Sequence, residues 1–170
     1  PSASASPSPS PTASALPAGF RVFKAPEGFS VALPKGWKVV DTQKDGDIAY
    51  RVTFGASGDP RTLAVTYSTQ AGPDPVAVWR DDVLPGLKQT EGFQQIGDIK
   101  ATTYQGDKAA DLEWFSGTGD NKVRTLGRGF LIGGGRSFSL RWTTPADEWN
   151  DAANRQALQT FFKTFKRSVN

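Results

Sequence analysis

The sequence predicts an α+β domain in which an antiparallel β-sheet is flanked by helices. Three observations predict this class: short runs in which apolar and polar residues alternate, two stretches with apolar residues at helical spacing, and turn residues between these segments. Alternation with a period of two gives one buried and one wet face, which is typical of antiparallel strands. The chain has 170 residues. A foldable part of about 150 residues buries roughly 70% of its unfolded surface, which is enough for one domain.

Residues 1–17 differ in composition from the rest of the chain. They contain only Pro, Ser, Ala, Thr and Leu, with no charged and no aromatic side chain. Such a segment buries too little apolar surface to offset its ordering entropy, so we expect a disordered linker that its prolines extend. It either joins two folded domains or acts as a stalk that holds a domain away from a membrane. We expect a single folded domain over residues 18–170.

The first part of this domain is expected to consist of β-hairpins. Turn residues such as Pro-Glu-Gly and Pro-Lys-Gly separate short apolar runs, several of which alternate strictly. The strands expected before the first helix cover residues 20–23, 29–33, 37–40, 50–54 and 63–67.

Residues 41–46 have a faint likeness to a calcium-binding loop. Gln43 stands where Asp or Asn is needed, and Val52 stands where a bidentate Glu should close the loop. We therefore expect a solvated turn here and no metal site.

A helix is expected to begin at Asp74 and Pro75, because Asp is a good N-cap and Pro fits the first helical turn. Apolar side chains follow at helical spacing, at Val76, Trp79, Val83 and Leu87. Pro85 removes a backbone donor inside this stretch, so the helix is expected to kink or end near it.

Further strands and a closing helix are expected in the second half. The strands cover residues 93–104, with a bend near Gly97, and then 109–115, 123–132 and 137–142, with hairpin turns at 117–121 and 133–135. The closing helix is expected from Pro145 or Glu148 to Phe165. It carries an apolar stripe made of Leu158, Phe161, Phe162 and Phe165. This stripe should face the sheet, with both adjacent Phe side chains mostly buried.

The residue types that many enzymes use are missing. The chain contains no His and no Cys, which excludes Ser-His-Asp and Cys-His catalysis and every metal site with His or Cys ligands. Asp111 and Glu113 share a strand face, but that spacing is more typical of a wet surface than of an acid/base pair. Gly127 and Gly129 miss the dinucleotide-binding spacing and are expected to be strand glycines. We expect no catalytic residues, no metal and no cofactor.

The charge of the chain is nearly balanced. The chain has 20 Lys and Arg side chains and 17 Asp and Glu side chains, which gives a net charge of +3. Nucleic-acid binding needs a clustered basic stripe rather than a slight excess of cations. We therefore expect no nucleic-acid partner.

One group of residues is a candidate ligand-binding site. Arg124 and Arg128 lie on one expected strand and Arg141 on the next, while Trp114 and Trp142 lie on strands that could adjoin them. Arginine beside aromatic rings can hold an anionic or ring-bearing ligand. In the alternative interpretation the aromatic side chains belong to the core and the arginines lie on the surface.

Residues 23–37, FKAPEGFSVALPKGW, resemble the opening hairpin of extracytoplasmic domains from actinobacteria. Such domains lie C-terminal to a transmembrane helix in Ser/Thr protein kinases, and also occur in secreted lipoproteins. The Asp-Pro helix start and the paired Phe of the closing helix extend the resemblance over residues 19–168. It implies a Mog1/PsbP-like fold, an α/β/α sandwich with an antiparallel sheet between helices.

The resemblance also implies a function. It suggests a non-catalytic extracellular sensor or ligand-binding domain of a membrane-anchored kinase, tethered through residues upstream of Pro1. Its partner would be an unknown small molecule or a cell-wall or secreted protein. The first alternative is the body of a secreted lipoprotein, which needs an acylated Cys upstream of Pro1. The second is an exported hydrolase that uses carboxylates alone. The absence of Cys suits an exported protein.

We predict that residues 1–17 are dispensable for folding, because their composition offers nothing to pack. A variant that begins at Ala18 should have the same thermal midpoint as the full chain in a calorimetric melt. A midpoint lower by about ten degrees, a shift of more than 1 kcal/mol for a domain of this size, would mean that the segment packs on the domain.

Overall fold

The structure of the chain is a computed structural model that describes residues 16–168. Most of the predicted linker, residues 1–15, lies outside the described residues. The backbone carbonyl of Pro17 accepts a hydrogen bond from the backbone N–H of Phe20 at 3.3 Å. The chain divides into two compact units. One holds the described residues up to Trp37 and from Ala152 onward, and the other spans residues 38–151.

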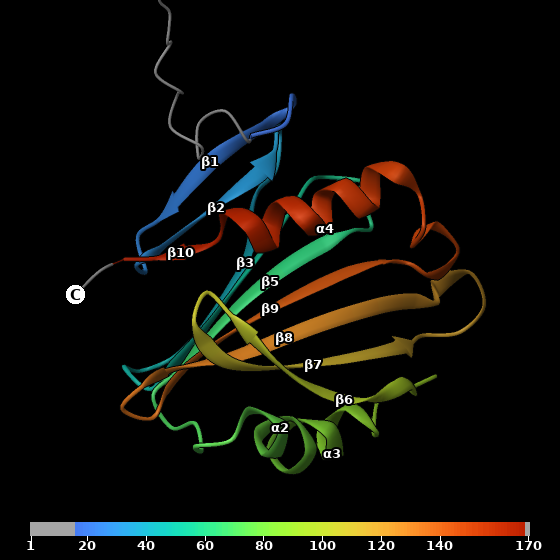
Figure 1. Ribbon diagram of the computed structural model, residues 1–170. Helices are drawn as coiled ribbons and strands as arrows, with labels where there is room; N and C mark the ends of the chain where they lie inside the picture. Colours follow the sequence, from blue (N-terminus) through green and yellow to red (C-terminus); the bar gives the residue numbers. More distant parts are fainter. Residues whose placement is uncertain (1–15, 169–170) are drawn as a thin grey trace, which may run out of the picture. The chain divides into compact units, whose positions relative to one another are not determined.

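The first unit combines a hairpin with the closing helix (Figure 1). Its elements are β1 (Phe20–Ala25), β2 (Phe29–Pro34), α4 (Ala152–Thr164) and β10 (Lys166–Arg167). β1 and β10 both pair antiparallel with β2, which gives the strand order β1-β2-β10. The hairpin turn follows the expected Pro-Glu-Gly sequence and closes through a bond from Gly28 N–H to the Ala25 carbonyl at 3.1 Å.

Aromatic rings from both ends of the sequence form the core of this unit. The Phe161 ring is fully buried, with its centroid 6.0 Å from Trp37 and 6.5 Å from Phe20. The Phe165 ring stacks on Phe29 at 5.7 Å. A side-chain bond reinforces the packing, since Thr164 Oγ1 accepts from the backbone N–H of Ala32 at 3.0 Å.

The prediction for the closing helix was partly wrong. Phe161 and Phe165 are buried as predicted, but Leu158 and Phe162 are only half-buried. The buried face of α4 instead includes the smaller side chains Asn154, Ala157 and Thr160. The helix also begins later than expected, because the residues before it form a 3-10 turn, η3 (Ala146–Glu148). The sequence did not predict β10.

The second unit is built on a seven-stranded sheet in which every neighbouring pair is antiparallel. Its strand order is β3-β4-β5-β9-β8-β7-β6. The strands are β3 (Lys38–Asp45), β4 (Ala49–Gly55), β5 (Thr62–Ser68), β6 (Gln94–Tyr104), β7 (Asp107–Ser116), β8 (Val123–Gly133) and β9 (Arg136–Pro145). A 3-10 turn, η2 (Gly119–Asn121), lies between β7 and β8. The predicted α+β class with an antiparallel sheet is confirmed.

The prediction of a solvated turn at residues 41–46 was wrong for residues 41–45, although the segment is exposed as expected. Residues 41–45 belong to β3, where they pair with β4 in a register that includes Thr42 opposite Val52. All eight residues of β3 are exposed. The strand is held by its backbone pairing with β4 at the edge of the sheet. Because neither face of β3 is buried, its sequence shows no alternation of apolar and polar residues.

A short irregular helix lies along the sheet. It consists of α2 (Pro75–Ala77), a π-helical turn η1 (Val78–Val83) and α3 (Leu84–Leu87). The predicted N-cap is confirmed, because Asp74 Oδ1 accepts from the backbone N–H of Val76 at 3.0 Å. The predicted irregularity near Pro85 is also present. Since Pro85 offers no N–H, the preceding turn widens, and the N–H of Leu84 bonds to the Trp79 carbonyl five residues back.

The two faces of the seven-stranded sheet bury different side chains. On one face the helix packs on the sheet through Trp79, Leu84, Ala110, Leu112 and Trp114. The alternating residues of the central strands are buried on the other face, among them Val52, Phe54, Leu63, Val65, Leu140 and Trp142. The predicted bend in β6 is confirmed by a positive φ of 68° at Gly97 and a register shift from Ile96 to Lys100. No helix within residues 16–168 is long and apolar enough to cross a membrane.

We predict that Phe161→Ala destabilises the protein by about 3–5 kcal/mol, because it removes a fully buried ring from the first unit. Phe162→Ala should cost clearly less, because its side chain is half-buried. Urea unfolding monitored by fluorescence measures both free energies of unfolding. Equal losses for the two variants would contradict the observed orientation of α4.

Candidate ligand-binding pocket

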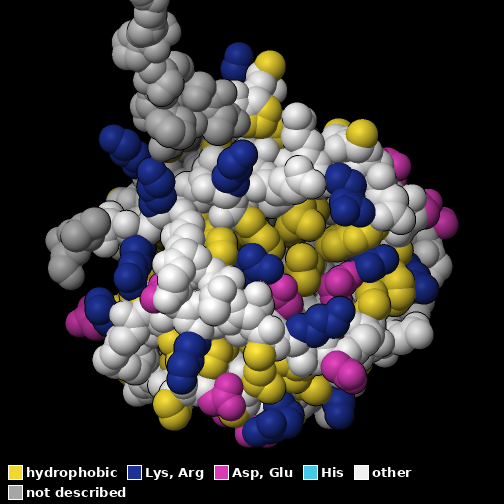
Figure 2. All heavy atoms as spheres, viewed as in Figure 1, with side chains coloured by type: hydrophobic (Ala, Val, Ile, Leu, Met, Phe, Trp, Pro, Cys, Tyr) yellow, Lys and Arg dark blue, Asp and Glu magenta, His cyan; other side chains and the backbone are white. Residues whose placement is uncertain are grey.

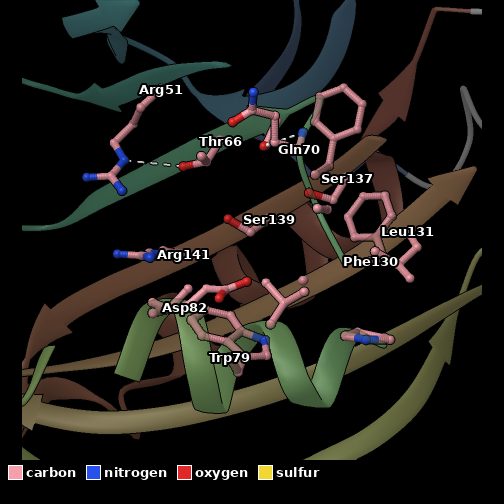
Figure 3. A pocket seen from close by; sticks show the side chains of 17 residues that line it. Arg51, Thr66, Gln70, Trp79, Asp82, Phe130, Leu131, Ser137, Ser139 and Arg141 are labelled. Carbon is pink, nitrogen blue, oxygen red and sulfur yellow. Dashed lines mark hydrogen bonds between the residues drawn. The ribbon is translucent and has the colours of Figure 1, made fainter. Parts of the chain in front are cut away.

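A pocket of about 470 Å³ lies between the helix and one face of the seven-stranded sheet. The floor comes from β4, β5, β9 and β8, and the wall comes from α2 and η1 (Figure 3). The loop after β5 also contributes, through Gln70 and Ala71. The volume lies within the range of roughly 300–1,000 Å³ that is typical of small-molecule sites.

Trp79 fixes the helix beside this pocket. Its indole Nε1 donates a buried hydrogen bond to the backbone carbonyl of Ala110 at 2.9 Å. Its ring lies against Gly127 and Gly129, and a Cβ atom at Gly127 would come within 2.6 Å of the indole. The two are strand glycines, as predicted, and they leave room for the Trp79 ring.

Arg141 lines the pocket, and its guanidinium group has an unusual environment. Its guanidinium lies 5.6 Å from the rings of both Trp79 and Trp114. The Nε is buried and has no hydrogen-bond partner within residues 16–168. Burial and, second, the positive charge of Arg51 lower the pKa of Arg141 to about 10. The side chain still carries its charge at neutral pH, with no carboxylate among the causes of its shifted pKa.

Polar side chains surround the arginines. The Arg51 Nε donates to Thr66 Oγ1 at 3.2 Å, across the β4–β5 pair. Ser137 and Ser139 lie on β9 and line the same pocket. These groups are hydrogen-bonding partners that carry no negative charge. Among the described lining residues, Asp82 is the one carboxylate beside the two guanidinium groups, and it is exposed to solvent.

The structure does not bring the five predicted site residues together. Arg141 and Trp114 lie on the sheet face that packs against the helix. Arg128 pairs with Leu140, the residue before Arg141 on β9, so the side chains of Arg128 and Arg141 lie on opposite faces of the sheet. Arg124 and Trp142 lie on the same face as Arg128. The prediction of one cleft formed by all five was therefore wrong. Strand alternation separates them, because positions that differ by an odd number lie on opposite faces.

Arg124 and Arg128 are occupied by ion pairs. Arg128 binds Asp111 through two parallel bonds of 2.8 and 2.9 Å, and the side-chain hydrogen bond to Asp111 raises the pKa of Arg128. The Arg124 Nε binds Glu113 at 2.8 Å. The Asp111–Glu113 face was expected to be wet, but these four side chains are half-buried. Trp142 is 1% exposed, which agrees with the alternative interpretation that it belongs to the core.

Arg141 is the one predicted site residue among the described residues that line the pocket, and the sequence did not indicate the role of Arg51 or Trp79 there. A signal for the pocket was present in β9, where Ser137, Ser139 and Arg141 alternate with buried aromatic and aliphatic residues. Gly127 and Gly129, also two residues apart, mark the neighbouring stretch of β8 as a place where another element packs closely.

Charges of both signs are interspersed on the face shown in Figure 2. No basic stripe of the kind that nucleic acids require is seen on that face. No group of three or more Asp or Glu within the described residues 16–168 could hold a metal ion.

Comparison with solved structures identifies the fold class. The chain is similar to the solution structure of the cyanobacterial PsbP protein CyanoP from Synechocystis, with a TM-score of 0.64 and 19% identity, over 88% of this chain and 93% of that one. It is also similar to LpqN, involved in cell envelope biogenesis of Mycobacterium tuberculosis, with a TM-score of 0.52 and 17% identity, over 88% and 91%. The predicted PsbP-like fold is confirmed.

Residues 21–167 match the family of serine/threonine kinase C-terminal domains, and the chain belongs to that family. The predicted relation to kinase C-terminal domains is confirmed. The chain is thus an accessory domain of Ser/Thr kinases, separate from the part that carries kinase activity. No curated protein was found to match it.

We predict opposite effects of one substitution at two arginines. Arg141→Met should leave the free energy of unfolding at pH 7 unchanged or raise it by roughly 1–2 kcal/mol. A guanidinium whose folded pKa is depressed destabilises the folded state at every pH below that pKa. Arg128→Met should lower the stability by roughly 1–3 kcal/mol, because it leaves Asp111 half-buried without its partner.

Urea unfolding of the two variants and the wild type at pH 7 and low salt gives both values. Both variants replace Arg by Met on neighbouring strands, so the difference in β-propensity between Arg and Met affects both equally and cancels in the comparison. A loss at Arg141 as large as that at Arg128 would contradict our description of Arg141.

Proposed function

We propose that this chain is a non-catalytic, ligand-binding sensor domain that a membrane-anchored bacterial Ser/Thr kinase carries outside the membrane. Its membership of a family of kinase C-terminal domains supports an accessory role beside a kinase. The extracellular placement follows the resemblance of residues 23–37 to extracytoplasmic domains and the absence of Cys.

The environment of Arg141 is the observation that carries ligand binding. A half-buried cation whose charge no neighbouring carboxylate stabilises reduces the stability of a domain, so it has no value for folding alone. Arg141 nevertheless lines a pocket of sufficient size and is aligned by two indole rings. A group that costs stability and faces a cavity is typical of a site that a ligand completes.

The state of the carboxylates supports a non-catalytic role. Acid/base catalysis by carboxylates alone needs a pair whose pKa values are pushed apart. Asp111 and Glu113, the pair singled out by the sequence, are each held by an arginine. Each carboxylate is thus engaged by an arginine on the neighbouring strand, and the two do not form a pair that shares one site.

The pocket can be tested by filling it. Ser139 lies on the floor opposite Gly129, so Ser139→Leu should occupy part of the pocket without a clash against a neighbouring side chain on β8. In a thermal-shift screen of small molecules, compounds that stabilise the wild type should lose their effect in this variant. Thr42→Leu, on the exposed strand β3, is the matched control and should retain the response. Compounds that stabilise Ser139→Leu as strongly as the wild type would place binding elsewhere.

The sensor role requires a test in the parent protein. In a full-length kinase reconstituted in vesicles, a compound found in the screen should change the rate of autophosphorylation, and Ser139→Leu should abolish that change. A kinase that responds equally with the filled pocket would contradict the sensor role. A parent polypeptide with a lipid-modified Cys and no kinase domain would instead support the lipoprotein alternative.

A further inference from the structure

The pocket carries more positive charge than its own carboxylates balance. Arg51 and Arg141 both line it, whereas Asp82 is the one carboxylate among the described lining residues. Asp82 is exposed to solvent on the helix. The electrostatic effects on Arg141 come from burial and from Arg51, and both disfavour its charge. An anion placed between the two guanidinium groups would relieve both effects, since it supplies the missing counter-charge.

We propose that this pocket binds a small amphipathic oxyanion, a carboxylate or phosphate joined to an apolar or aromatic part, with the oxyanion between Arg141 and Arg51. This inference rests on the proposed ligand-binding function and specifies the chemical class of the ligand. Carboxylates and phosphates share the required chemistry, a compact negative group with several acceptor oxygens.

The donors at this position suit an oxyanion. A guanidinium presents five N–H donors in a planar fork that matches the oxygens of carboxylate and phosphate. Arg51 uses its Nε for Thr66, and Figure 3 shows the end of its side chain beyond that bond. Ser139 pairs with Thr66 across β5 and β9, lines the same pocket and adds a hydroxyl donor.

Two indole rings orient the Arg141 guanidinium in advance. Its central carbon lies 5.6 Å from both Trp79 and Trp114. Trp79 is itself fixed by its bond to the Ala110 carbonyl. A donor group that is already held in position loses less conformational entropy on binding, so this arrangement favours recognition of a planar or tetrahedral anion.

Part of the remaining pocket lining is apolar. Pro75, Val78 and Val83 line it from the helix, and Leu131 lines it from β8. A purely inorganic ion would leave this part of the surface unfilled. A ligand with an apolar or aromatic portion would cover it and gain the hydrophobic contribution. The same two arginines disfavour a cationic ligand by repulsion.

A matched series of probes tests the inference on the full chain. The series consists of phenyl phosphate, phenylacetate, benzyl alcohol, benzylamine and inorganic phosphate, each titrated up to about 10 mM to detect millimolar binding. Calorimetry gives the affinities, and the indole N–H resonance of Trp79 in NMR spectra reports on the pocket. We expect phenyl phosphate or phenylacetate to bind more tightly than benzyl alcohol and inorganic phosphate, and benzylamine not to bind. The phosphate and carboxylate probes distinguish the two oxyanions.

The variants separate charge from structure. Arg141→Met should weaken binding of the preferred anion by about ten- to a hundredfold, the range for loss of a charge-assisted hydrogen bond. Arg51→Met should weaken it by a smaller factor and serves as a second variant if Arg141→Met does not fold. Arg136→Met is the matched control, since it removes an exposed arginine from the same strand outside the pocket. It should leave the affinity unchanged.

The outcomes distinguish this inference from the proposed function. Binding of benzyl alcohol or benzylamine that Ser139→Leu abolishes and Arg141→Met does not would overturn the anion inference and leave a ligand-binding pocket in place. Anion binding that is equal in wild type and Arg141→Met would also overturn it. If no anionic probe binds at the highest concentration, the inference is wrong for this class of ligand.

Discussion

The seating of Trp79 on β8 is the interaction on which the pocket depends. The indole lies where two glycines leave space and bonds to a backbone carbonyl of β7. This one side chain therefore sets how close the helix comes to the sheet and which of its residues form the pocket wall. It also provides one of the two rings that orient Arg141. A side chain at Gly127 would move the indole, and both the wall and the arginine would lose their positions.

The arginines on the two faces of the seven-stranded sheet have different electrostatic surroundings. On one face Arg124 and Arg128 are neutralised by Glu113 and Asp111 on the adjacent strand. On the other face Arg141 lies beside two indole rings, and the charge of Arg51 lowers its pKa. The first arrangement is complete within the chain. In the second, no carboxylate is among the causes of the shifted pKa of Arg141, and this difference is the basis of the proposed binding function.

The sequence predicted the parts of the fold that local patterns determine. Asp74 and Pro75 marked the start of the helix, Gly97 marked the bend of β6, and alternation marked the inner strands. The strand expected at residues 37–40 covers the start of β3, but its continuation over residues 41–45 could not be predicted from alternation, because both faces are exposed and pairing with β4 holds it. The buried face of α4 differs from the predicted stripe, because it also uses Ala157 and Thr160, small or polar residues that a search for large apolar side chains does not select.

The sequence indicated which residue types form the candidate site, but it did not indicate which of these residues lie on the same face of the sheet. Arginine and tryptophan were correctly expected on adjacent strands, but the register that pairs Gly127 with Arg141 decides which of them share a face. That register depends on the length of the hairpin turn at residues 133–135. Arg51 comes from a strand two positions away from β9, and no local pattern connects it to Arg141. To predict the site, one would have needed the order of the strands in the sheet, which residue types alone do not give.

Both outer strands of the seven-stranded sheet are irregular. β3 shifts register between Val39 and Asp41, and β6 shifts between Ile96 and Lys100. Each also carries exposed charges near the irregularity, at Asp41 and Lys100. A bulged, charged edge is a poor template for another strand. Copies of this domain held at high density on a surface would therefore resist joining edge to edge into extended aggregates.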